Sequence, residues 1–434
     1  MSKFWSISLF ILIIVSIYGS IVPAPAALIK GGPISSADTA WMLTSTALVL
    51  LMTPGLSFFY GGMVSPKNVI STMLQSFICM GVISVLWVVV GFSLAFGDSI
   101  GGIIGNPFTF FLFRGVTGET HPALAPTIPL VLFAFFQLKF AIITPALITG
   151  SFAERVKFSS YLIFIVLFSL FIYAPLAHMT WHPDGILRKL GVLDFAGGTV
   201  VHMSAGFAAL AGALFLGRRK SHLENEKHVP ANIPFVLLGT GLLWFGWFGF
   251  NAGSAMGANA LASLAFGTTN TASAAGAMAW IFFDGVMKRK PSALGACIGA
   301  VIGLVAITPA AGYVTIGQSI FFGTFASIVS NIFVSLKSKT SLDDTLDVFP
   351  CHGVGGIVGM LLTAVFAKDV GLIFGHFHTF KMHLLALVVV AIFTFGGSYL
   401  LYLIVDKIMP LRVAGEHEEE GLDVSQHGES VLQS

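Results

Sequence analysis

Eleven apolar stretches, each long enough to cross about 30 Å of hydrocarbon, follow residue 37 of this chain. Only 10% of the 434 residues are charged, whereas roughly 25% of an ordinary soluble domain is charged. So few charges could not cover a soluble surface, which excludes a soluble enzyme, a nucleic-acid binder and a disordered chain. With 48 glycines, the sequence predicts an all-α polytopic membrane protein of eleven closely packed transmembrane helices. We place the spans near residues 38–61, 69–96, 128–152, 159–179, 196–216, 234–254, 259–285, 292–310, 315–336, 348–367 and 382–409.

Residues 1–26 have the layout of a secretory signal peptide. Lys3 precedes an apolar stretch from about Ile7 to Val22, and small residues follow at 24–27. We expect cleavage near Ala26 or Ala27, with a retained extra helix as the alternative. Cleavage would leave the mature N-terminus outside the cytoplasm.

The distribution of cations predicts the same orientation. With an exterior N-terminus, the cytoplasmic segments carry fourteen Lys and Arg residues and the exterior segments carry six. The positive-inside rule therefore favours an exterior N-terminus and a cytoplasmic C-terminus. We predict a multi-pass protein of the cell (inner) membrane, with a membrane domain at 38–409 and a cytoplasmic tail at 410–434.

Two pairs of spans indicate an inverted repeat. The third and eighth spans share the string Ile-Thr-Pro-Ala, at 143–146 and 307–310. The fifth and tenth spans each carry one histidine, His202 and His352. Both separations are five spans, and an odd separation gives the halves opposite orientations. The sequence thus predicts an inverted 5+5 repeat followed by a long eleventh helix.

Each of these histidines projects from a stripe of small residues on its helix. Two such stripes, facing each other at a pseudo-two-fold axis, would bring the imidazoles together near the membrane centre. The stripes are Gly198, Ala205, Gly206 and Ala209 beside His202, and Gly355, Gly356 and Gly359 beside His352.

A midplane histidine pair has several interpretations. The residues could be ordinary packing histidines, or they could share one hydrogen bond and pass a proton. A metal site would need three or four ligands, and apart from Cys351 no Asp, Glu or Cys lies near them in the sequence. We therefore predict no metal, and no cofactor. A passage without carboxylate rings suits a small solute that can lose its charge, because a dry cation is costly in low dielectric.

Stretches in order along residues 38–430 resemble the signatures of the ammonium transporter (Amt/Mep/Rh) family. The resemblance implies a homotrimer of eleven-helix protomers, each with its own pore. The stretches are PGLSFFYGGMV (54–64), FFQLKFAIITPALI (135–148), AERVKFSS (153–160), AHMTW (177–181), DFAGGTVVHMSA (194–205), GWFGFNAGSA (246–255), DVFPCHGVGGIVG (347–359) and the tail EEEGLDVSQHGES (418–430).

The resemblance implies an exterior ammonium recruitment site at Trp181, Phe140 and Ser254. An indole face can bind a desolvated cation with up to about 2 kcal/mol, and a hydroxyl oxygen can accept one ammonium N–H. Phe140 and Phe250 resemble the stacked rings that gate the pore below this site.

Deeper in the chain, His202 and His352 resemble the family's paired pore histidines, and Trp247 a pore-side aromatic residue. Asp194 matches an essential acidic position at the start of the fifth span, which we interpret as a helix N-cap and an orienting carboxylate. Acids before the tenth span could cap that helix in the same way, namely Asp343, Asp344 and Asp347.

The resulting hypothesis is an ammonium transporter or channel of the Amt branch, with methylammonium as an analogue. Ammonium would be deprotonated outside, and ammonia would cross, with or without the proton. The alternatives are an Rh-like channel for ammonia or carbon dioxide and an ammonium sensor. An enzyme is not expected, because no HExxH, P-loop or G-x-S-x-G string occurs. Membrane lipid and a PII-type regulatory protein at the tail are the expected partners.

Two polar residues of the third span have no assigned role. Lys139 precedes Phe140, and adjacent helix positions point about 100° apart. The lysine could snorkel, meet a polar group between protomers or lie at the exterior edge of its span. Gln137 could line the exterior vestibule or bond to a neighbouring helix.

Overall fold

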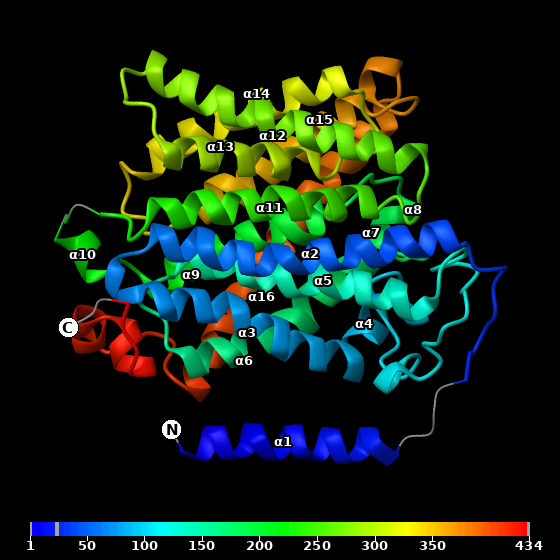
Figure 1. Ribbon diagram of the computed structural model, residues 1–434, viewed down its shortest axis with the longest axis horizontal. Coiled ribbons are helices and arrows are strands. Elements are labelled where there is room, and N and C mark those ends of the chain that lie inside the picture. Colours follow the sequence, from blue (N-terminus) through cyan, green and yellow to red (C-terminus); the bar gives the residue numbers. More distant parts are fainter. Residues whose placement is uncertain (1, 22–25, 225, 227, 432–434) are drawn as a thin grey trace.

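The apolar stretches fold into long helices that run side by side across one bundle (Figure 1). The computed structural model describes residues 2–21, 26–224, 226 and 228–431. Within this part of the chain, ten helical stretches are long and apolar enough to span a membrane. The first of the ten is α1, which lies outside the bundle. The other nine, together with α12 and the shorter α13, form the eleven expected spans.

The bundle helices begin and end within a few residues of the predicted limits. The single-element spans are α2 (Ser36–Met63), α11 (Ile233–Gly253), α12 (Ala260–Val286), α13 (Ala293–Ile307), α14 (Ile316–Lys337) and α16 (Phe377–Ile408). The other five spans each combine α-helices with short 3₁₀ or π segments, labelled η. The second span consists of η1 (Pro66–Asn68), α3 (Val69–Leu86), η2 (Trp87–Gly91) and α4 (Phe92–Phe96), the third of α5 (Leu130–Ile148) and η4 (Thr149–Ser151), and the fourth of α6 (Phe158–Phe168), η5 (Ser169–Tyr173) and α7 (Ala174–Trp181). The fifth consists of η6 (Gly198–Met203) and α9 (Ser204–Leu216), and the tenth of η7 (Phe349–Val354) and α15 (Gly355–Phe366).

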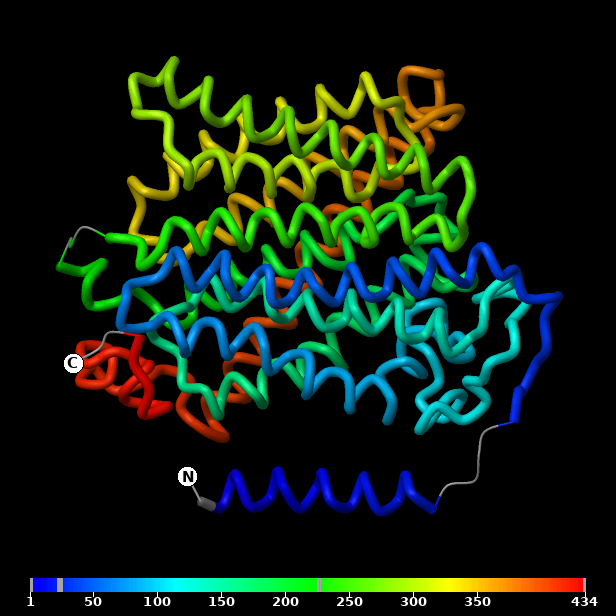
Figure 2. Tube along the Cα trace, in the orientation of Figure 1, coloured from blue at the N-terminus to red at the C-terminus, as the bar shows by residue number. Residues whose placement is uncertain are grey.

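Short elements occupy the two ends of the bundle. At the end of the bundle where α7 finishes lie β1 (Ser99–Ile100), β2 (Ile104–Gly105), η3 (Phe111–Phe113), α8 (Ile186–Lys189) and η8 (Leu372–Phe374). At the opposite end lie α10 (Lys220–Leu223), α17 (Gly415–Glu420) and η9 (Asp423–His427), so we call this end the tail end (Figure 2).

Helix α1 (Ser2–Ile21) lies apart from the bundle (Figure 1). None of its membrane-length window is buried against the rest of the chain. The Trp5 ring approaches the Phe158 ring of α6, with 6.4 Å between centroids. Residues 22–25, which precede the expected cleavage near Ala26 or Ala27, lie outside the described residues, and cleavage stays a prediction.

The predicted stripes of small residues meet in part. Gly356 of the tenth span faces the fifth span as predicted, whereas Gly355 and Gly359 face Val305 and Ala306 of α13, and Gly353, outside the predicted stripe, lies against Gly206. A Cβ on Gly206 would lie well under 3.0 Å from the backbone of Gly353, and one on Gly356 would crowd the Gly198 carbonyl oxygen at 3.1 Å. The fifth and tenth spans therefore cross with their backbones nearly in contact, which only glycine permits.

Both histidines lie in π-helical segments of six residues, His202 in η6 and His352 in η7. The sequence predicts regular α-helical spacing around both histidines, and the structure departs from it in these two segments. Single π-helical turns inside α-helices are rare and frequent at functional sites. Five-residue π-helical segments also occur in the second and fourth spans, as η2 and η5, but the six-residue segments that carry a histidine occur in the corresponding fifth and tenth spans.

The tail packs on the ends of the membrane helices. The Asp423 carboxylate accepts hydrogen bonds from the backbone N–H groups of Ile70 (3.0 Å) and Ser71 (2.7 Å), in the first turn of α3. The side-chain oxygen of Gln426 accepts the Phe158 N–H at the start of α6, at 2.8 Å. Since these N–H groups have no partner inside their own helices, the tail completes the hydrogen bonding of both.

The glycine crossing generates a stability prediction. We expect Gly206→Ala to lower the unfolding free energy by about 1–3 kcal/mol, because the added methyl must push two backbones apart. The measurement is thermal unfolding of the purified protein in detergent. Gly241→Ala is the matched control, since a Cβ there meets nothing within 4 Å. Equal melting temperatures for both variants would contradict the crossing.

Candidate functional site

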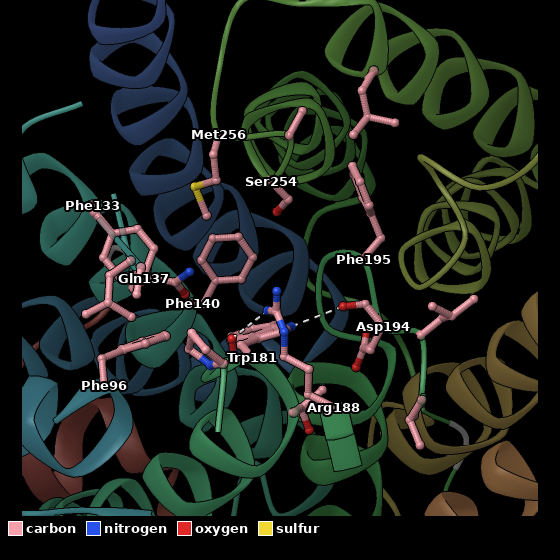
Figure 3. Close-up of a pocket in the computed structure, with 18 of the residues that line it drawn as sticks. Phe96, Phe133, Gln137, Phe140, Trp181, Arg188, Asp194, Phe195, Ser254 and Met256 are labelled. Carbon is pink, nitrogen blue, oxygen red and sulfur yellow. Dashed lines mark hydrogen bonds between the residues drawn. The ribbon is translucent and has the colours of Figure 1, made fainter. Parts of the chain in front are cut away.

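A pocket of about 540 Å³ opens at the end opposite the tail (Figure 3). Three residues of its lining are those that the sequence grouped as a recruitment site: Trp181 from α7, Phe140 from α5 and Ser254 after α11. Ser254 donates its hydroxyl hydrogen to the Phe250 carbonyl oxygen at 2.8 Å. The hydroxyl oxygen is thereby left with lone pairs that can accept from a ligand.

Aromatic rings form the floor of this pocket. The rings of Phe140 and Trp181 meet edge to face, with centroids 5.6 Å apart and an interplanar angle of 80°. Phe250 lies beyond Phe140, with 4.2 Å between centroids. Both phenylalanine side chains are fully buried, so the pocket ends at this pair of rings.

Hydrogen bonds to the backbone hold the indole in place. The Trp181 ring nitrogen donates to the Asp194 carbonyl oxygen at 3.1 Å. Arg188 donates to the Trp181 carbonyl oxygen at 2.8 Å and lies beside the indole (Figure 3). These two contacts fix the position of the indole, and Arg188 itself also lines the pocket.

The two histidines meet below the phenylalanines. The Nδ1 atoms of His202 and His352 lie 3.2 Å apart, so one ring donates and the other accepts. His202 stacks on Trp247 at 5.4 Å and 17°, and the Trp247 ring nitrogen donates to the Thr308 hydroxyl at 2.9 Å. The buried Nε2 of His202 has no hydrogen-bond partner, so it can bond to a molecule in the adjoining cavity.

Only small cavities remain along this line. One cavity of about 10 Å³ is lined by His202, His352, Trp247 and Phe250 with aliphatic side chains. A second of about 10 Å³ continues past His352 and Cys351 towards the tail end. Each is close to the minimum volume that a single water needs. The path is therefore narrow and mostly apolar, and the imidazoles are its main polar groups.

Asp194 anchors the start of the fifth span. One carboxylate oxygen accepts the N–H groups of Gly197 (2.7 Å) and Gly198 (2.6 Å), and the other accepts the N–H (2.7 Å) and the hydroxyl of Thr199. Gly197 has φ +120°, a backbone conformation that suits glycine. The carboxylate therefore fixes the first turn of η6, which begins four residues before His202.

Several pocket residues were not predicted, namely Arg188, Phe195, Met256 and Tyr313. They come from loops or short helices, where no periodicity marks the inward side. Gln137 does line the pocket, and its position three residues before Phe140 places both on one helix face. Lys139 does not line it; its ammonium lies 5.7 Å from the centroid of the exposed Phe135 ring.

Among the described residues, no group of three His, Cys, Asp or Glu side chains is placed to hold a metal ion. The site combines an aromatic pocket, a two-ring constriction and a narrow histidine-lined path through an inverted-repeat bundle. That combination defines a channel or transporter class of membrane protein.

Comparisons with known proteins identify the family. The profile described as Ammonium Transporter Family matches residues 40–432. An ammonium transporter of Aquifex aeolicus is 45% identical over 97% of this chain and 98% of its own. Ammonium transporter Amt1 of Archaeoglobus fulgidus is 42% identical over 91% of this chain and 99% of its own. The crystal structure of Candida albicans Mep2 has a TM-score of 0.83 at 32% identity and covers 88% of each chain. This chain belongs to the ammonium transporter family, a family of transporters and not of enzymes.

The anchoring role of Asp194 can be tested by an isosteric change. We expect Asp194→Asn to lower the unfolding free energy by about 1–2 kcal/mol. The reason is that the NH2 group of asparagine would replace one of the two oxygens that accept hydrogen bonds, and an NH2 group can only donate. Thermal unfolding measures the loss, and the exposed Asp369→Asn serves as control. An undiminished melting temperature for Asp194→Asn would count against the anchor.

Proposed function

We propose that this protein recruits ammonium at the pocket of Trp181, Phe140 and Ser254, deprotonates it and conducts ammonia past His202 and His352. The observation that carries the proposal is the change of environment at Phe140 and Phe250. On one side lies an open pocket with an aromatic face and polar groups; on the other lies a path too narrow for a hydrated ion.

Solvation explains why the proton must leave the nitrogen. Desolvating an ammonium ion costs many kcal/mol in a medium of low dielectric. The indole face and the Ser254 oxygen offset part of this cost in the pocket. Beyond the phenylalanines no charged side chain lines the cavity of the histidine pair, so neutral ammonia has the lower barrier. The proton either stays outside or follows through the imidazoles.

The orientation is part of the proposal. The positive-inside rule puts the tail end in the cytoplasm and the pocket outside the inner membrane. Residues 1–26 would be removed as a signal peptide, which N-terminal sequencing of the purified protein tests. We further propose a homotrimer embedded in lipid, with residues 410–434 as the cytoplasmic tail and a PII-type protein binding there.

Two other functions fit the same fold. A structure titled Sensor Amt Protein is 31% identical, with a TM-score of 0.83, so an ammonium sensor is the second candidate. An Rh-like channel for ammonia or carbon dioxide is the third. Uptake of labelled methylammonium separates a sensor, which moves little substrate, from a conductor. Ammonium-evoked current then separates electrogenic transport from conduction of a neutral gas, which carries no charge.

The histidine pair is tested in proteoliposomes on solid-supported membranes. We expect His202→Ala combined with His352→Ala to reduce the current evoked by ammonium and methylammonium by roughly tenfold, equivalent to about 1.4 kcal/mol of barrier. The cause is loss of the path's main polar groups. His376→Ala, on an exposed histidine, is the control. Unchanged current and selectivity in the double variant would exclude the histidine role.

The recruitment site makes a separate prediction. We expect Trp181→Leu to raise the half-saturating ammonium concentration by roughly tenfold, because removing the indole removes about 1–2 kcal/mol of cation–π attraction. The same currents, measured over a range of ammonium concentrations, give the value. Phe171→Leu, on an exposed ring, should leave it unchanged. A wild-type concentration dependence in Trp181→Leu would place recruitment elsewhere.

A further inference from the structure

A second aspartate occupies the position of Asp194 in the other half of the repeat. Asp194 lies eight residues before His202, and Asp344 lies eight residues before His352. Asp344 is fully buried. Its carboxylate accepts the backbone N–H groups of Val348 (3.1 Å) and Phe349 (2.7 Å), where η7 begins.

The backbone between aspartate and helix is also alike in the two halves. Three residues after each aspartate the chain takes a positive φ, +120° at Gly197 and +57° at Asp347. Each carboxylate then reaches the first N–H groups of a π-helical segment that carries a pore histidine. The two caps are therefore equivalent parts of the repeat, and they lie at opposite ends of the bundle.

The surroundings of the two caps differ. Asp194 also accepts the Thr199 hydroxyl, whereas the hydrogen bonds of the Asp344 carboxylate come from the backbone. Asp344 lies instead within a group of titratable and charged residues. Lys337 at the end of α14 donates to the Asp344 carbonyl oxygen at 2.6 Å and pairs with Asp347 at 2.6 Å. The electrostatic neighbours on the other elements are Arg155, Tyr60 from α2 and Cys351 from η7.

These surroundings make the Asp344 carboxylate easier to protonate than that of the adjacent Asp343. Burial raises the pKa of Asp344 to about 6, with Asp347 adding to the rise and Lys337 opposing it. The adjacent Asp343 is also buried, but hydrogen bonds from Arg219 and the charge of Arg155 lower its pKa to about 2. Near neutral pH a modest acidification would therefore neutralise Asp344 and leave Asp343 ionised.

We propose that Asp344 is a positioning residue whose ionised carboxylate holds η7, and with it His352, in register with His202, and that protonation from the tail side releases this hold. The inference rests on the proposed conduction past the histidine pair. It adds a control of that pair by pH at the cytoplasmic face.

The chain of contacts from Asp344 to the pore is short. Hydrogen bonds to a charged carboxylate are roughly twice as strong as those to a neutral group, and the N–H groups at the start of a helix have no other partner. Phe349 is three residues from His352, within the same six-residue segment. Loosening that segment alters the 3.2 Å contact between the two imidazoles.

The test is uptake of labelled methylammonium into right-side-out membrane vesicles that contain the full chain. The bath pH is held constant, and the vesicles are loaded with buffers from about pH 8 to about pH 5, the range over which a group of pKa about 6 titrates. At the upper pH we expect Asp344→Asn to reduce uptake roughly fivefold, in the range that loss of a helix cap produces. Below about pH 6 its uptake relative to wild type should approach one, because the wild type is then neutral too. The ratio cancels the driving force common to both proteins.

Two variants that leave the Asp344 carboxylate intact should shift the midpoint of the pH profile in opposite directions. Lys337→Gln removes a positive neighbour and should move the midpoint of the pH profile up by about one unit. Asp347→Asn removes a negative neighbour and should move it down. Asp369→Asn, on the surface, should follow the wild type. These variants remain informative even if Asp344→Asn does not fold.

A ratio for Asp344→Asn that is independent of internal pH would overturn the proposal. So would midpoints for Lys337→Gln and Asp347→Asn that coincide or move in the same direction, because the titrating group would then lie elsewhere. Absence of methylammonium uptake by the wild type at every pH would instead refute the proposed function.

Discussion

The rest of the structure depends on one close contact, the crossing of two helices at Gly206 and Gly353. Lipid tails are as apolar as most helix surfaces, so helices in a membrane associate through close packing rather than by escaping water. Without side chains at the crossing, the two backbones approach far enough for His202 and His352 to share a hydrogen bond at 3.2 Å. A larger residue would separate the rings and open space between them. The histidine pair is thus a consequence of how the spans pack.

This packing also sets the polarity of the path. Tight helices leave only small cavities around the imidazoles, whereas the loops at the other side of Phe140 enclose a pocket of about 540 Å³. Water and a cation can be accommodated in the pocket, but the path offers a solute few partners besides the two rings. The division between the two environments coincides with the stacked phenylalanines. A solute that moved from the pocket past these two rings would therefore lose most of its hydration.

Much of this fold could be predicted from the sequence because a bilayer restricts a chain to apolar helices of defined length. The limits of the spans, the inverted repeat and the facing of Gly206 towards the other half followed from hydropathy and spacing. The π-helical segments did not, since periodicity reasoning assumes a regular helix and His202 and His352 sit where that regularity ends. Arg188 and Tyr313 reach the pocket from segments without periodicity. The roles proposed for Trp181 and Phe250 rest on family resemblance, because an aromatic residue in a membrane helix more often contacts lipid or packs against other side chains.

The inverted repeat explains how equivalent parts acquire different properties. An inverted repeat puts the cap of one histidine helix at one face of the bundle and the cap of the other at the opposite face. Asp194 lines the open pocket and is saturated by backbone and hydroxyl donors, while Asp344 is enclosed with Lys337 and Asp347. Because no charged side chain lines the cavity of the histidine pair, the helix that each end caps is a direct structural connection from that end to the histidines. The environments of Asp194 and Asp344 therefore act differently on His202 and His352. This difference arises from the loops that surround the two caps rather than from the pore.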